Sequence, residues 1–96
     1  LILDPGFGFA KTVEQNWQLL REMAVLQEFG KEILVGLSRK SFLFRPLGIT
    51  PADALPATQV ADFIALQNGA DILRVHDVAE AVRTVKLYRL FNRASA

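Results

Sequence analysis

The sequence predicts an α/β fold in which short parallel strands alternate with helices. Three short aliphatic runs lie far apart along the 96-residue chain, at Leu1–Leu3, Ile33–Leu37 and Ile72–Val75. Continuous aliphatic runs of this kind are typical of strands that a parallel sheet buries on both faces. Each run precedes a segment with helical periodicity, and repeated strand–helix units imply a parallel sheet with right-handed crossovers.

The first strand is followed by a predicted helix that starts near Thr12. Its apolar residues recur at helical spacing, at Val13, Trp17, Leu20 and Ala24. Thr12 and Gln15 have the spacing of a capping box, in which each side chain bonds the backbone N–H of the other residue. Gly30 is a suitable C-terminal stop for this helix.

Two further helices are predicted after the second and third strands. The stretch from Thr50 to Asp53 has the pattern of a helix cap followed by a first-turn proline. Pro56 is expected to break this stretch, so that the main helix runs from about Ala57 to Asn68. After the third strand, Asp77 and Glu80 have the spacing of a capping box at the start of the last helix.

Three strand–helix units leave an open sheet edge at Leu1–Leu3, so they do not form a closed domain. A complete (β/α)₈ barrel needs roughly 250 residues. We therefore expect residues 1–96 to be the last three units of such a TIM barrel, and the chain to be a piece of a longer protein. An open, doubly wound sheet is the alternative architecture.

The composition excludes several classes of function. The formal net charge of +1 gives no general attraction to nucleic acid or to a membrane surface, and we expect neither as a partner. The chain has no cysteine and one histidine, so it cannot form a disulfide or a zinc site by itself. The basic residues of the last helix are expected to face solvent; they are Arg83, Lys86, Arg89 and Arg93.

Polar residues cluster at the carboxyl ends of all three predicted strands. The first strand ends in Asp4-Pro5-Gly6, the second in Ser38-Arg39-Lys40-Ser41, and the third contains Arg74 and ends in His76-Asp77. Parallel α/β folds build their ligand sites at these ends. The residues that we expect to converge on one pocket are Asp4, Lys40, Arg74 and His76.

These residue types point to a flat, polar ligand that carries an anion. A carboxylate such as that of Asp4 can accept two N–H donors from a heterocycle. Lys40, Arg74 and His76 suit a phosphate or carboxylate, and a guanidinium also stacks on flat rings. Glycines near Asp4 let a ligand approach the backbone closely, and Phe9 supplies an aromatic wall.

Each of these residues also has a purely structural interpretation. Asp4 before Pro5-Gly6 is typical of a turn. Lys40 could be an ordinary solvated lysine, and His76-Asp77 could serve only to cap the last helix. Arg74 fits such an interpretation less well, because a charge inside an apolar strand is rarely buried without a partner.

Taken together, these motifs resemble the last three strand-end motifs of the dihydropteroate synthase family. The matching stretches are Asp4-Pro5-Gly6-Phe7-Gly8-Phe9-Ala10-Lys11, Ser38-Arg39-Lys40-Ser41 and Arg74-Val75-His76-Asp77-Val78. They occur in the order and spacing of the family and cover essentially the whole chain. The resemblance implies the pterin-binding superfamily and its (β/α)₈ barrel, with this chain as the carboxyl-terminal third.

The resemblance also implies a role for each site residue. Lys40 and Arg74 would be the catalytic residues. The residues that bind the pterin would be Asp4, Gly8, Lys40 and Arg74. Those that bind 4-aminobenzoate would be Phe9, Lys40 and Ser41. Arg74 and His76 would bind diphosphate, and no metal ligand is expected in this part of the chain.

The implied activity is that of a transferase in folate biosynthesis. It joins 6-hydroxymethyl-7,8-dihydropterin diphosphate to 4-aminobenzoate and releases diphosphate, and sulfonamides compete with the aminobenzoate. The family implies Mg²⁺, with its ligand in the missing amino-terminal part, a cytoplasmic location and a homodimer formed through the helices of this region. The 96 residues alone are expected to be inactive.

Two other functions stay open from the sequence. A pterin-dependent methyltransferase of the same superfamily would share the aspartate that reads the pterin, but it has no need for anion sites around Lys40 and His76. A non-catalytic structural or dimerisation module is the second alternative, and the intact set of polar strand-end residues argues against it.

Overall fold

The computed structural model describes residues 1–8 and 10–94 and contains three parallel strands in one sheet, in the order β1-β2-β3. The strands are β1 (Ile2–Leu3), β2 (Glu32–Val35) and β3 (Ile72–Leu73). In the pairing register, Leu3 lies opposite Ile33 and Val35 lies opposite Leu73. The predicted parallel sheet is confirmed.

Each strand is shorter than the aliphatic run that predicted it. Leu37 lies beyond the end of β2 and yet is completely buried. An aliphatic run reports burial, whereas a strand also requires hydrogen bonds to a neighbouring strand. Residues that are buried but not paired, such as Leu37, therefore mark where the chain leaves the sheet to form the strand-end loops.

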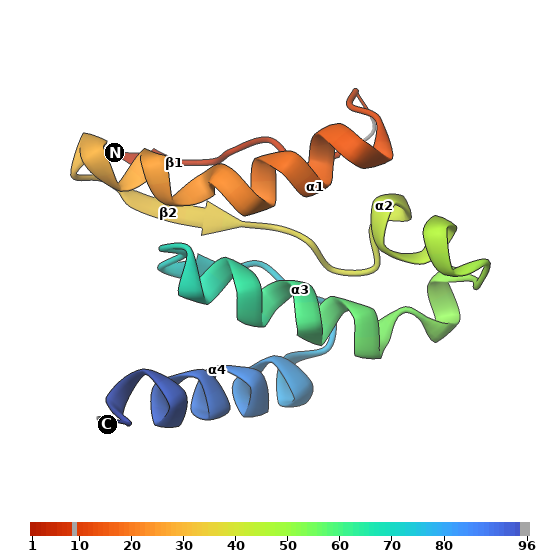
Figure 1. Ribbon diagram of the computed structural model, residues 1–96. Helices are drawn as coiled ribbons and strands as arrows, with labels where there is room; N and C mark the ends of the chain where they lie inside the picture. Colours follow the sequence, from red (N-terminus) through yellow and green to blue (C-terminus); the bar gives the residue numbers. More distant parts are fainter. Residues whose placement is uncertain (9, 95–96) are drawn as a thin grey trace.

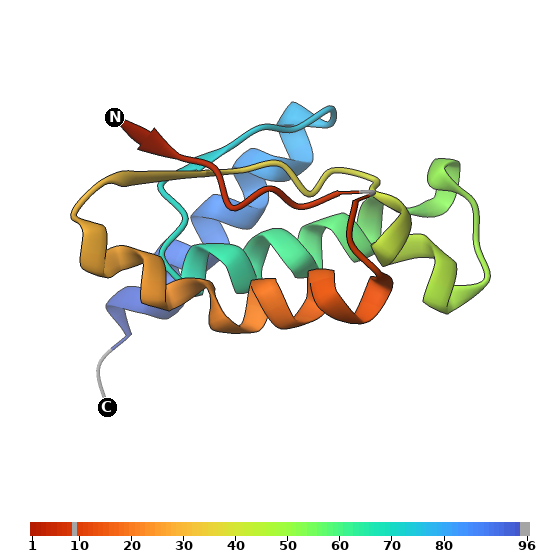
Figure 2. The same cartoon turned by 90° about the horizontal axis from the view of Figure 1, so that it is seen from above.

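The helices cover one face of the sheet, as Figure 2 shows. The α-helices are α1 (Val13–Glu22), α2 (Ser41–Phe44), α3 (Leu55–Gln67) and α4 (Val78–Arg93). Shorter 3₁₀ helices are η1 (Met23–Phe29), η2 (Arg45–Leu47) and η3 (Pro51–Asp53). Figure 1 shows α1, α3 and α4 following one another in chain order, which is the predicted succession of three strand–helix units.

Helix α1 begins and continues as the sequence predicts. The Thr12 hydroxyl accepts from the Gln15 backbone N–H at 3.0 Å, and the Gln15 side-chain oxygen accepts from the Thr12 N–H at 2.9 Å. These two bonds complete the predicted capping box. The helical path continues through η1 and stops at Gly30, whose φ of 64° lies in the left-handed region that glycine adopts readily.

Helix α4 begins directly after Asp77 as predicted, but the predicted start of α3 and the predicted capping box at Asp77 are wrong. Pro56 does not break the chain before the main helix, because α3 begins at Leu55 and holds Pro56 in its first turn. A proline is tolerated there, since the first N–H groups of a helix have no intrahelical partner. Asp77 precedes α4 but makes no side-chain capping bond; its carboxylate is bound by Arg39 instead.

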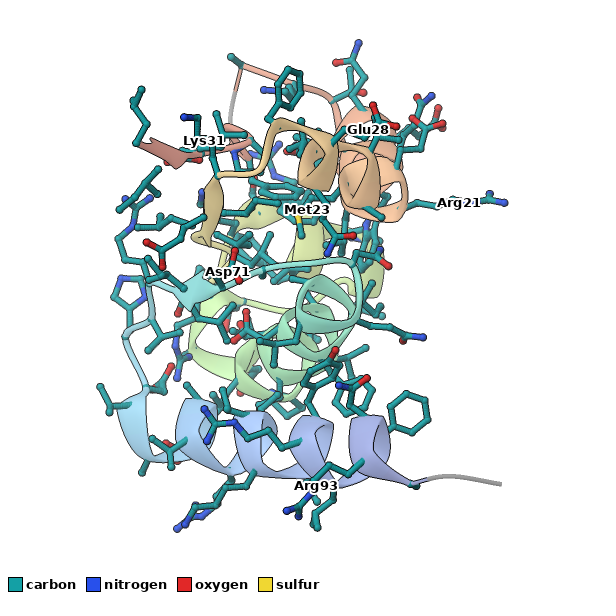
Figure 3. All side chains as sticks on the ribbon, turned by 90° about the vertical axis from the view of Figure 1, so that its left-hand side faces the viewer. Arg21, Met23, Glu28, Lys31, Asp71 and Arg93 are labelled. Atoms are coloured by element: carbon teal, nitrogen blue, oxygen red, sulfur yellow. The ribbon has the colours of Figure 1, made fainter. Side chains whose placement is uncertain are left out.

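The core lies between the sheet and the helices and includes an aromatic cluster under the strand ends. The ring of Phe42 stacks on that of Phe7 with centroids 6.0 Å apart, and it meets the edge of Trp17 at 5.5 Å. The Trp17 indole N–H also donates to the Phe42 carbonyl oxygen at 3.1 Å. These contacts fasten α1, α2 and the first strand-end loop to one another. Figure 3 shows Met23 among the neighbouring side chains, and Met23 is buried in the same core.

One carboxylic acid is buried in the contact between α3 and the elements that follow it. Asp62 is only 1% exposed, and its Oδ1 atom has no hydrogen-bond partner. A small cavity beside it is also lined by Ser38, Thr58, Val75 and Asp77. Burial removes the carboxylate from water and raises the pKa of Asp62 to about 7.

Other surfaces of the sheet and of α4 remain open. Leu1 and Ile2 at β1 are 97% and 50% exposed. An apolar groove runs between β3 and α4, and its lining includes Leu66, Leu73, Val75, Val82 and Val85. The four basic residues of α4 are exposed as predicted, and Figure 3 shows Arg93 pointing away from the core. None of the helices in residues 1–8 and 10–94 combines the length and apolar composition needed to cross a membrane.

The buried Asp62 predicts a pH-dependent stability. A carboxyl group titrates near pH 3.9 in an unfolded chain, and the folded-state pKa of Asp62 is about 7. The protein therefore loses stability as the pH rises from about 4 through about 7, because the buried carboxylate must ionise. Asp62→Asn stays neutral, so its free energy of unfolding should exceed that of the wild type by up to about 4 kcal/mol above neutrality.

The measurement is thermal or urea denaturation of the two proteins from acid to mildly alkaline pH. Asp53→Asn, a change at an exposed carboxylate in η3, is the matched control. A difference between wild type and Asp62→Asn that does not grow as the pH rises toward neutrality would contradict the prediction.

Candidate active site

The carboxyl ends of β2 and β3 form a small pocket. It is lined by Gly36, Ser38, Lys40, Arg74, Val75 and His76. Three of the four residues that the sequence analysis expected to converge, Lys40, Arg74 and His76, therefore share one pocket. Two fixed cations and an imidazole around one space suit an anionic ligand.

Lys40 is not an ordinary solvated lysine. It is half-buried, and its Nζ atom donates to the Phe7 carbonyl oxygen at 2.7 Å. Burial lowers the pKa of Lys40, nearby Arg74 and Lys11 lower it further, and the Asp4 carboxylate raises it. The ammonium thus ties the first strand-end loop to the second and lies within the electrostatic reach of both Asp4 and Arg74.

Asp4 is exposed and does not line the pocket. Its Oδ1 atom accepts from the Gly6 backbone N–H at 2.9 Å, which is the bond of an aspartate-initiated turn. The turn interpretation of Asp4 therefore accounts for one of its two carboxylate oxygens, the one bonded to Gly6. The first loop also carries Lys11, whose Nζ atom donates to the Gly6 carbonyl oxygen at 2.6 Å.

The first loop is held from below by a residue that the sequence analysis did not single out. Asn16 is 2% exposed, and its side chain accepts from the Gly8 N–H at 3.0 Å and donates to the Gly8 carbonyl at 3.1 Å. These two bonds fix both backbone polar groups of Gly8. Phe9, predicted as the aromatic wall, lies outside the described residues. Ser41, predicted to hold a carboxylate, is half-buried at the start of α2.

Arg74 was expected inside the third strand, but it directly follows β3 and is exposed. Its guanidinium lies against the backbone at Gly36, the residue after β2. A Cβ atom on Gly36 would lie 2.7 Å from Nη2 and 3.1 Å from Nε of Arg74. Such an approach is possible only because glycine has no side chain. Gly36 therefore determines where the guanidinium sits. In the sequence, Gly36 stands inside the aliphatic run Ile33–Leu37, and its role was not predicted. An isolated glycine inside a strand pattern is the feature that could have indicated a close approach to the backbone there.

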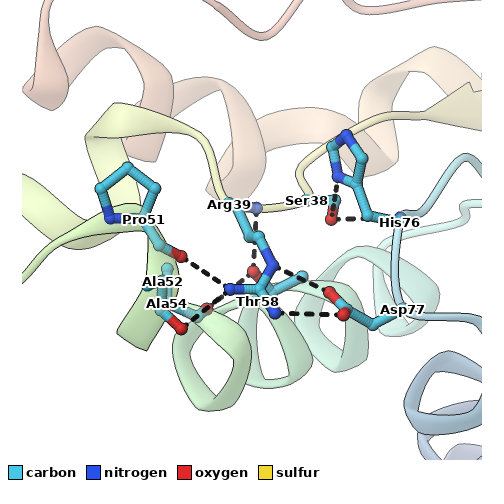
Figure 4. Close-up of polar contacts among 8 residues, drawn as sticks. All are labelled: Ser38, Arg39, Pro51, Ala52, Ala54, Thr58, His76 and Asp77. Carbon is cyan, nitrogen blue, oxygen red and sulfur yellow. Dashed lines mark hydrogen bonds and ion pairs between the residues drawn. The ribbon is translucent and has the colours of Figure 1, made fainter.

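Two side-chain links join the loops that follow β2 and β3, as Figure 4 shows. The Ser38 hydroxyl lies 2.7 Å from Nδ1 of His76 and accepts from the His76 backbone N–H at 3.3 Å. In the next position along both loops, Arg39 donates from Nε and Nη2 to the two carboxylate oxygens of Asp77, each at 3.0 Å. Both links join residues 38 apart in sequence, the same offset as the Val35–Leu73 strand pair.

Arg39 also forms hydrogen bonds with the segment that precedes α3. Its Nη1 atom donates to the carbonyls of Pro51 and Ala52 at 2.7 and 3.0 Å. Its backbone N–H donates to the Thr58 hydroxyl at 3.0 Å, and its φ of 54° lies in the left-handed region. The two-pronged contact raises the pKa of Arg39 and lowers that of Asp77. The sequence analysis quoted Arg39 only within a motif, because its partner Asp77 is distant in the chain.

The described residues do not form a metal site. No group of three or more histidine, cysteine, aspartate or glutamate side chains in residues 1–8 and 10–94 is arranged to hold an ion. The polar residues of the pocket are donors and cations, which suit an anion rather than a metal. The polar side chains that line this pocket therefore do not fit a Mg²⁺ ion.

Parallel strand–helix units with a cationic pocket at the strand ends are typical of α/β proteins that bind an anionic small molecule at that edge of the sheet. Comparison with known families specifies the class: the family described as pterin binding enzyme matches residues 1–76. The chain belongs to the pterin binding enzyme family. Its strand–helix units are those of a barrel, and the doubly wound alternative is set aside.

The similar proteins are dihydropteroate synthases. The dihydropteroate synthase of Escherichia coli (strain K12) is 41% identical over 87 residues, which cover 91% of this chain and 31% of that protein. The structure of Yersinia pestis dihydropteroate synthase with a sulfonamide drug complex has a TM-score of 0.93 at 38% identity, covering 98% of this chain and 34% of that one. The Coxiella burnetii enzyme in complex with pteroic acid has a TM-score of 0.93 at 33% identity, covering 98% and 35%. The chain spans about a third of the length of the curated relatives that it matches.

The contact between Gly36 and Arg74 predicts a variant that folds but binds anions poorly. In Gly36→Ala the new Cβ collides with the far end of a flexible side chain, so Arg74 can move away at little cost in stability. We expect inorganic diphosphate to bind about tenfold more weakly, because the guanidinium leaves its position. Calorimetric titration of the full-length protein measures this loss.

A double-mutant cycle isolates the cause of that loss. In an Arg74→Ala background, Gly36→Ala should have no further effect on diphosphate binding, because the displaced group is absent. Additive losses in the double variant would mean that the added methyl group acts through something other than Arg74.

The pairing of Arg39 with Asp77 predicts that Arg39→Lys lowers the melting temperature at neutral pH. A lysine cannot make the two-pronged contact with the carboxylate or reach the carbonyls in front of α3 at the same time. Because the pairing lowers the pKa of Asp77, its stabilisation is present above the ordinary carboxyl range and is lost as the pH falls through the lowered value.

The difference in melting temperature between wild type and Arg39→Lys should therefore shrink in strong acid. Arg83→Lys, an exposed substitution on α4, is the control and should leave the melting curve unchanged. An equal melting temperature for wild type and Arg39→Lys at neutral pH would show that the link does not stabilise the loops.

Proposed function

We propose that this chain is part of a dihydropteroate synthase. The enzyme would join 6-hydroxymethyl-7,8-dihydropterin diphosphate to 4-aminobenzoate, giving dihydropteroate and diphosphate. The observation that carries the proposal is the pocket shared by Lys40, Arg74 and His76, in a chain of the pterin binding enzyme family. Relatives from several organisms bear that activity in their names, which supports the choice among enzymes of this family.

The chain would act as part of a complete barrel of its relatives' length. The open edge at β1 and the apolar groove between β3 and α4 are the surfaces that further barrel elements would cover. Residues 1–96 by themselves lack the remainder of such a barrel, so we propose that they are inactive alone. The barrel's remaining strand ends would supply the other half of the substrate site.

The pterin would lie between Asp4 and Arg74. The Asp4 carboxylate would accept N–H donors from the pyrimidine edge of the pterin, through the oxygen that the Gly6 turn leaves available. The Arg74 guanidinium, held against Gly36, would stack on the pterin ring, and Gly8 would leave room for it. Lys40 would bond the pterin from the side of the first loop.

The reaction would break the bond between the pterin methylene carbon and the diphosphate oxygen and form a bond from that carbon to the amine nitrogen of 4-aminobenzoate. The electron pair of the broken bond leaves with diphosphate, and the amine gives up one proton. Arg74 and His76 would stabilise the negative charge that develops on the leaving group. Phe9, Lys40 and Ser41 would hold the aminobenzoate, with Ser41 near its carboxylate.

Several further properties belong to this proposal. Magnesium would be held by residues outside this chain and would neutralise charge on the diphosphate. A homodimer would form through the outward faces of α3 and α4, and the enzyme would work in the cytoplasm on small soluble substrates, without nucleic acid or membrane. The sulfonamide bound by the Yersinia pestis enzyme makes competition between sulfonamides and aminobenzoate the corresponding expectation here.

Two alternative functions are less well supported. A pterin-dependent methyltransferase would bind the pterin but has no use for a pocket of Lys40, Arg74 and His76 suited to diphosphate. A non-catalytic structural module would not need Lys40, Arg74 and His76 around one pocket. The names of the relatives also favour the synthase over both.

Diphosphate release by the full-length protein tests the proposed function. With pterin diphosphate and Mg²⁺ present, release should depend on 4-aminobenzoate and be accompanied by dihydropteroate. Lys40→Ala should lower the rate by about 100-fold, because a preorganised cation is lost from the site. Lys31→Ala, which removes an exposed lysine before β2, should retain full activity.

Other outcomes separate the alternatives. Binding of the pterin without diphosphate release would favour the methyltransferase, and no binding of either substrate would favour a structural module. Equal activity of Lys40→Ala and wild type would exclude Lys40 from the catalytic machinery.

A further inference from the structure

We propose that Ser38 is a positioning residue that fixes the tautomer and the orientation of the His76 ring. It would hold Nδ1 as a hydrogen-bond acceptor and leave the hydrogen on Nε2. This inference rests on the proposed function in one respect only, namely that His76 meets the diphosphate. The geometry of the Ser38–His76 contact does not depend on the substrate.

The two bonds between the residues determine the direction of the hydroxyl hydrogen. The backbone N–H of His76 can only donate, so the Ser38 oxygen accepts there at 3.3 Å. The same oxygen lies 2.7 Å from Nδ1. Among the described residues the structure gives the hydroxyl hydrogen of the buried Ser38 no acceptor other than this nitrogen, so the hydroxyl donates to Nδ1. In a neutral imidazole, one nitrogen accepts and the other carries the hydrogen. The arrangement therefore assigns the hydrogen to Nε2.

The ring is fixed in orientation as well as in tautomer. Ser38 is only 7% exposed, and it follows β2 in the register that pairs β2 with β3. The Arg39–Asp77 link holds the next pair of residues in the same loops, as Figure 4 shows. In that figure the second ring nitrogen points away from Ser38. The hydroxyl therefore has little freedom to move, and its bond to Nδ1 orients the exposed imidazole.

The consequence is a pocket whose polar side chains present hydrogen-bond donors. Lys40 and Arg74 carry only donors, and an Nε2–H on His76 adds a neutral third donor in the same pocket. The oxygens of a phosphate or diphosphate are acceptors and match this set. With the other tautomer, an imidazole lone pair would face the anion and repel it. Ser38 thereby favours an anion in the pocket through the orientation of His76.

Nitrogen NMR of the His76 ring tests the tautomer directly. The full-length protein is labelled with ¹⁵N in the histidine rings, and His76→Gln identifies the His76 resonances by removing them. At about pH 8, above the ordinary range of an imidazole, Nδ1 should have the chemical shift of an unprotonated nitrogen and Nε2 that of a protonated one. The opposite assignment in the wild type overturns the proposal, whether or not any Ser38 variant folds.

Variants of Ser38 test whether this residue is the cause. Ser38→Ala should mix the two tautomers, and Ser38→Thr, which keeps a hydroxyl, should restore the wild-type pattern. Ser41→Ala is the matched control for the spectrum, because the structure gives Ser41 no bond to His76. An unchanged tautomer in Ser38→Ala would overturn the role of Ser38.

Binding of inorganic diphosphate connects the tautomer to the site. Ser38→Ala should bind diphosphate about tenfold more weakly than wild type, and Ser38→Thr should recover most of the loss. Equal binding by Ser38→Ala and wild type would overturn the effect on the anion. If the wild type has the expected tautomer but binds no diphosphate, the positioning of the ring stands and the proposed function fails.

Discussion

The pairing of β2 with β3 at a constant offset of 38 residues is the constraint on which the pocket depends. At the amino end, Asp71 donates its backbone N–H to the Ile33 carbonyl at 2.8 Å and accepts from the Ile33 N–H at 2.9 Å through its side chain. At the carboxyl end, Ser38–His76 and Arg39–Asp77 continue the same offset after the backbone ladder has ended. A slip of one residue would turn every side chain of one strand to the opposite face, and the pocket would lose its members.

The same arrangement leaves the cations of the pocket available to a ligand. Lys40 is bonded to a backbone carbonyl and Arg74 lies over a glycine, so both are held without a carboxylate partner among the described residues. The arginine that does pair with a carboxylate is Arg39, which stands beside the pocket and holds the loops together. Adjacent residues of one motif therefore have different roles: Arg39 is a structural cation, whereas Lys40, like Arg74 of the third strand end, is available to an anion.

Much of the fold and of the pocket could be predicted from the sequence, because these features are local. The aliphatic runs, the Thr12 capping box and the polar strand ends each depend on residues close in sequence, and parallel strands bring their carboxyl ends together by geometry. The features that were predicted wrongly or not at all depend instead on residues that are far apart in the sequence. Asp77 has the spacing of a helix cap, but its partner Arg39 lies 38 residues away and competes successfully for the carboxylate. Gly36 and Asp62 acquire their importance only from neighbours that the fold supplies, Arg74 for Gly36 and the residues that bury the carboxyl group for Asp62.

The lowered pKa of Lys40 has a consequence for how the protein responds to anions in solution. Part of that lowering comes from the repulsion between Lys40 and Arg74, which a bound anion would relieve. Any multivalent anion that binds in the pocket should therefore stabilise the fold by an amount that grows with the logarithm of its concentration once this exceeds the Kd, and added salt should weaken this stabilisation by screening. We therefore expect phosphate and sulfate buffers to compete with diphosphate for this pocket, so that diphosphate affinities measured in them are lower than those measured in a buffer without multivalent anions.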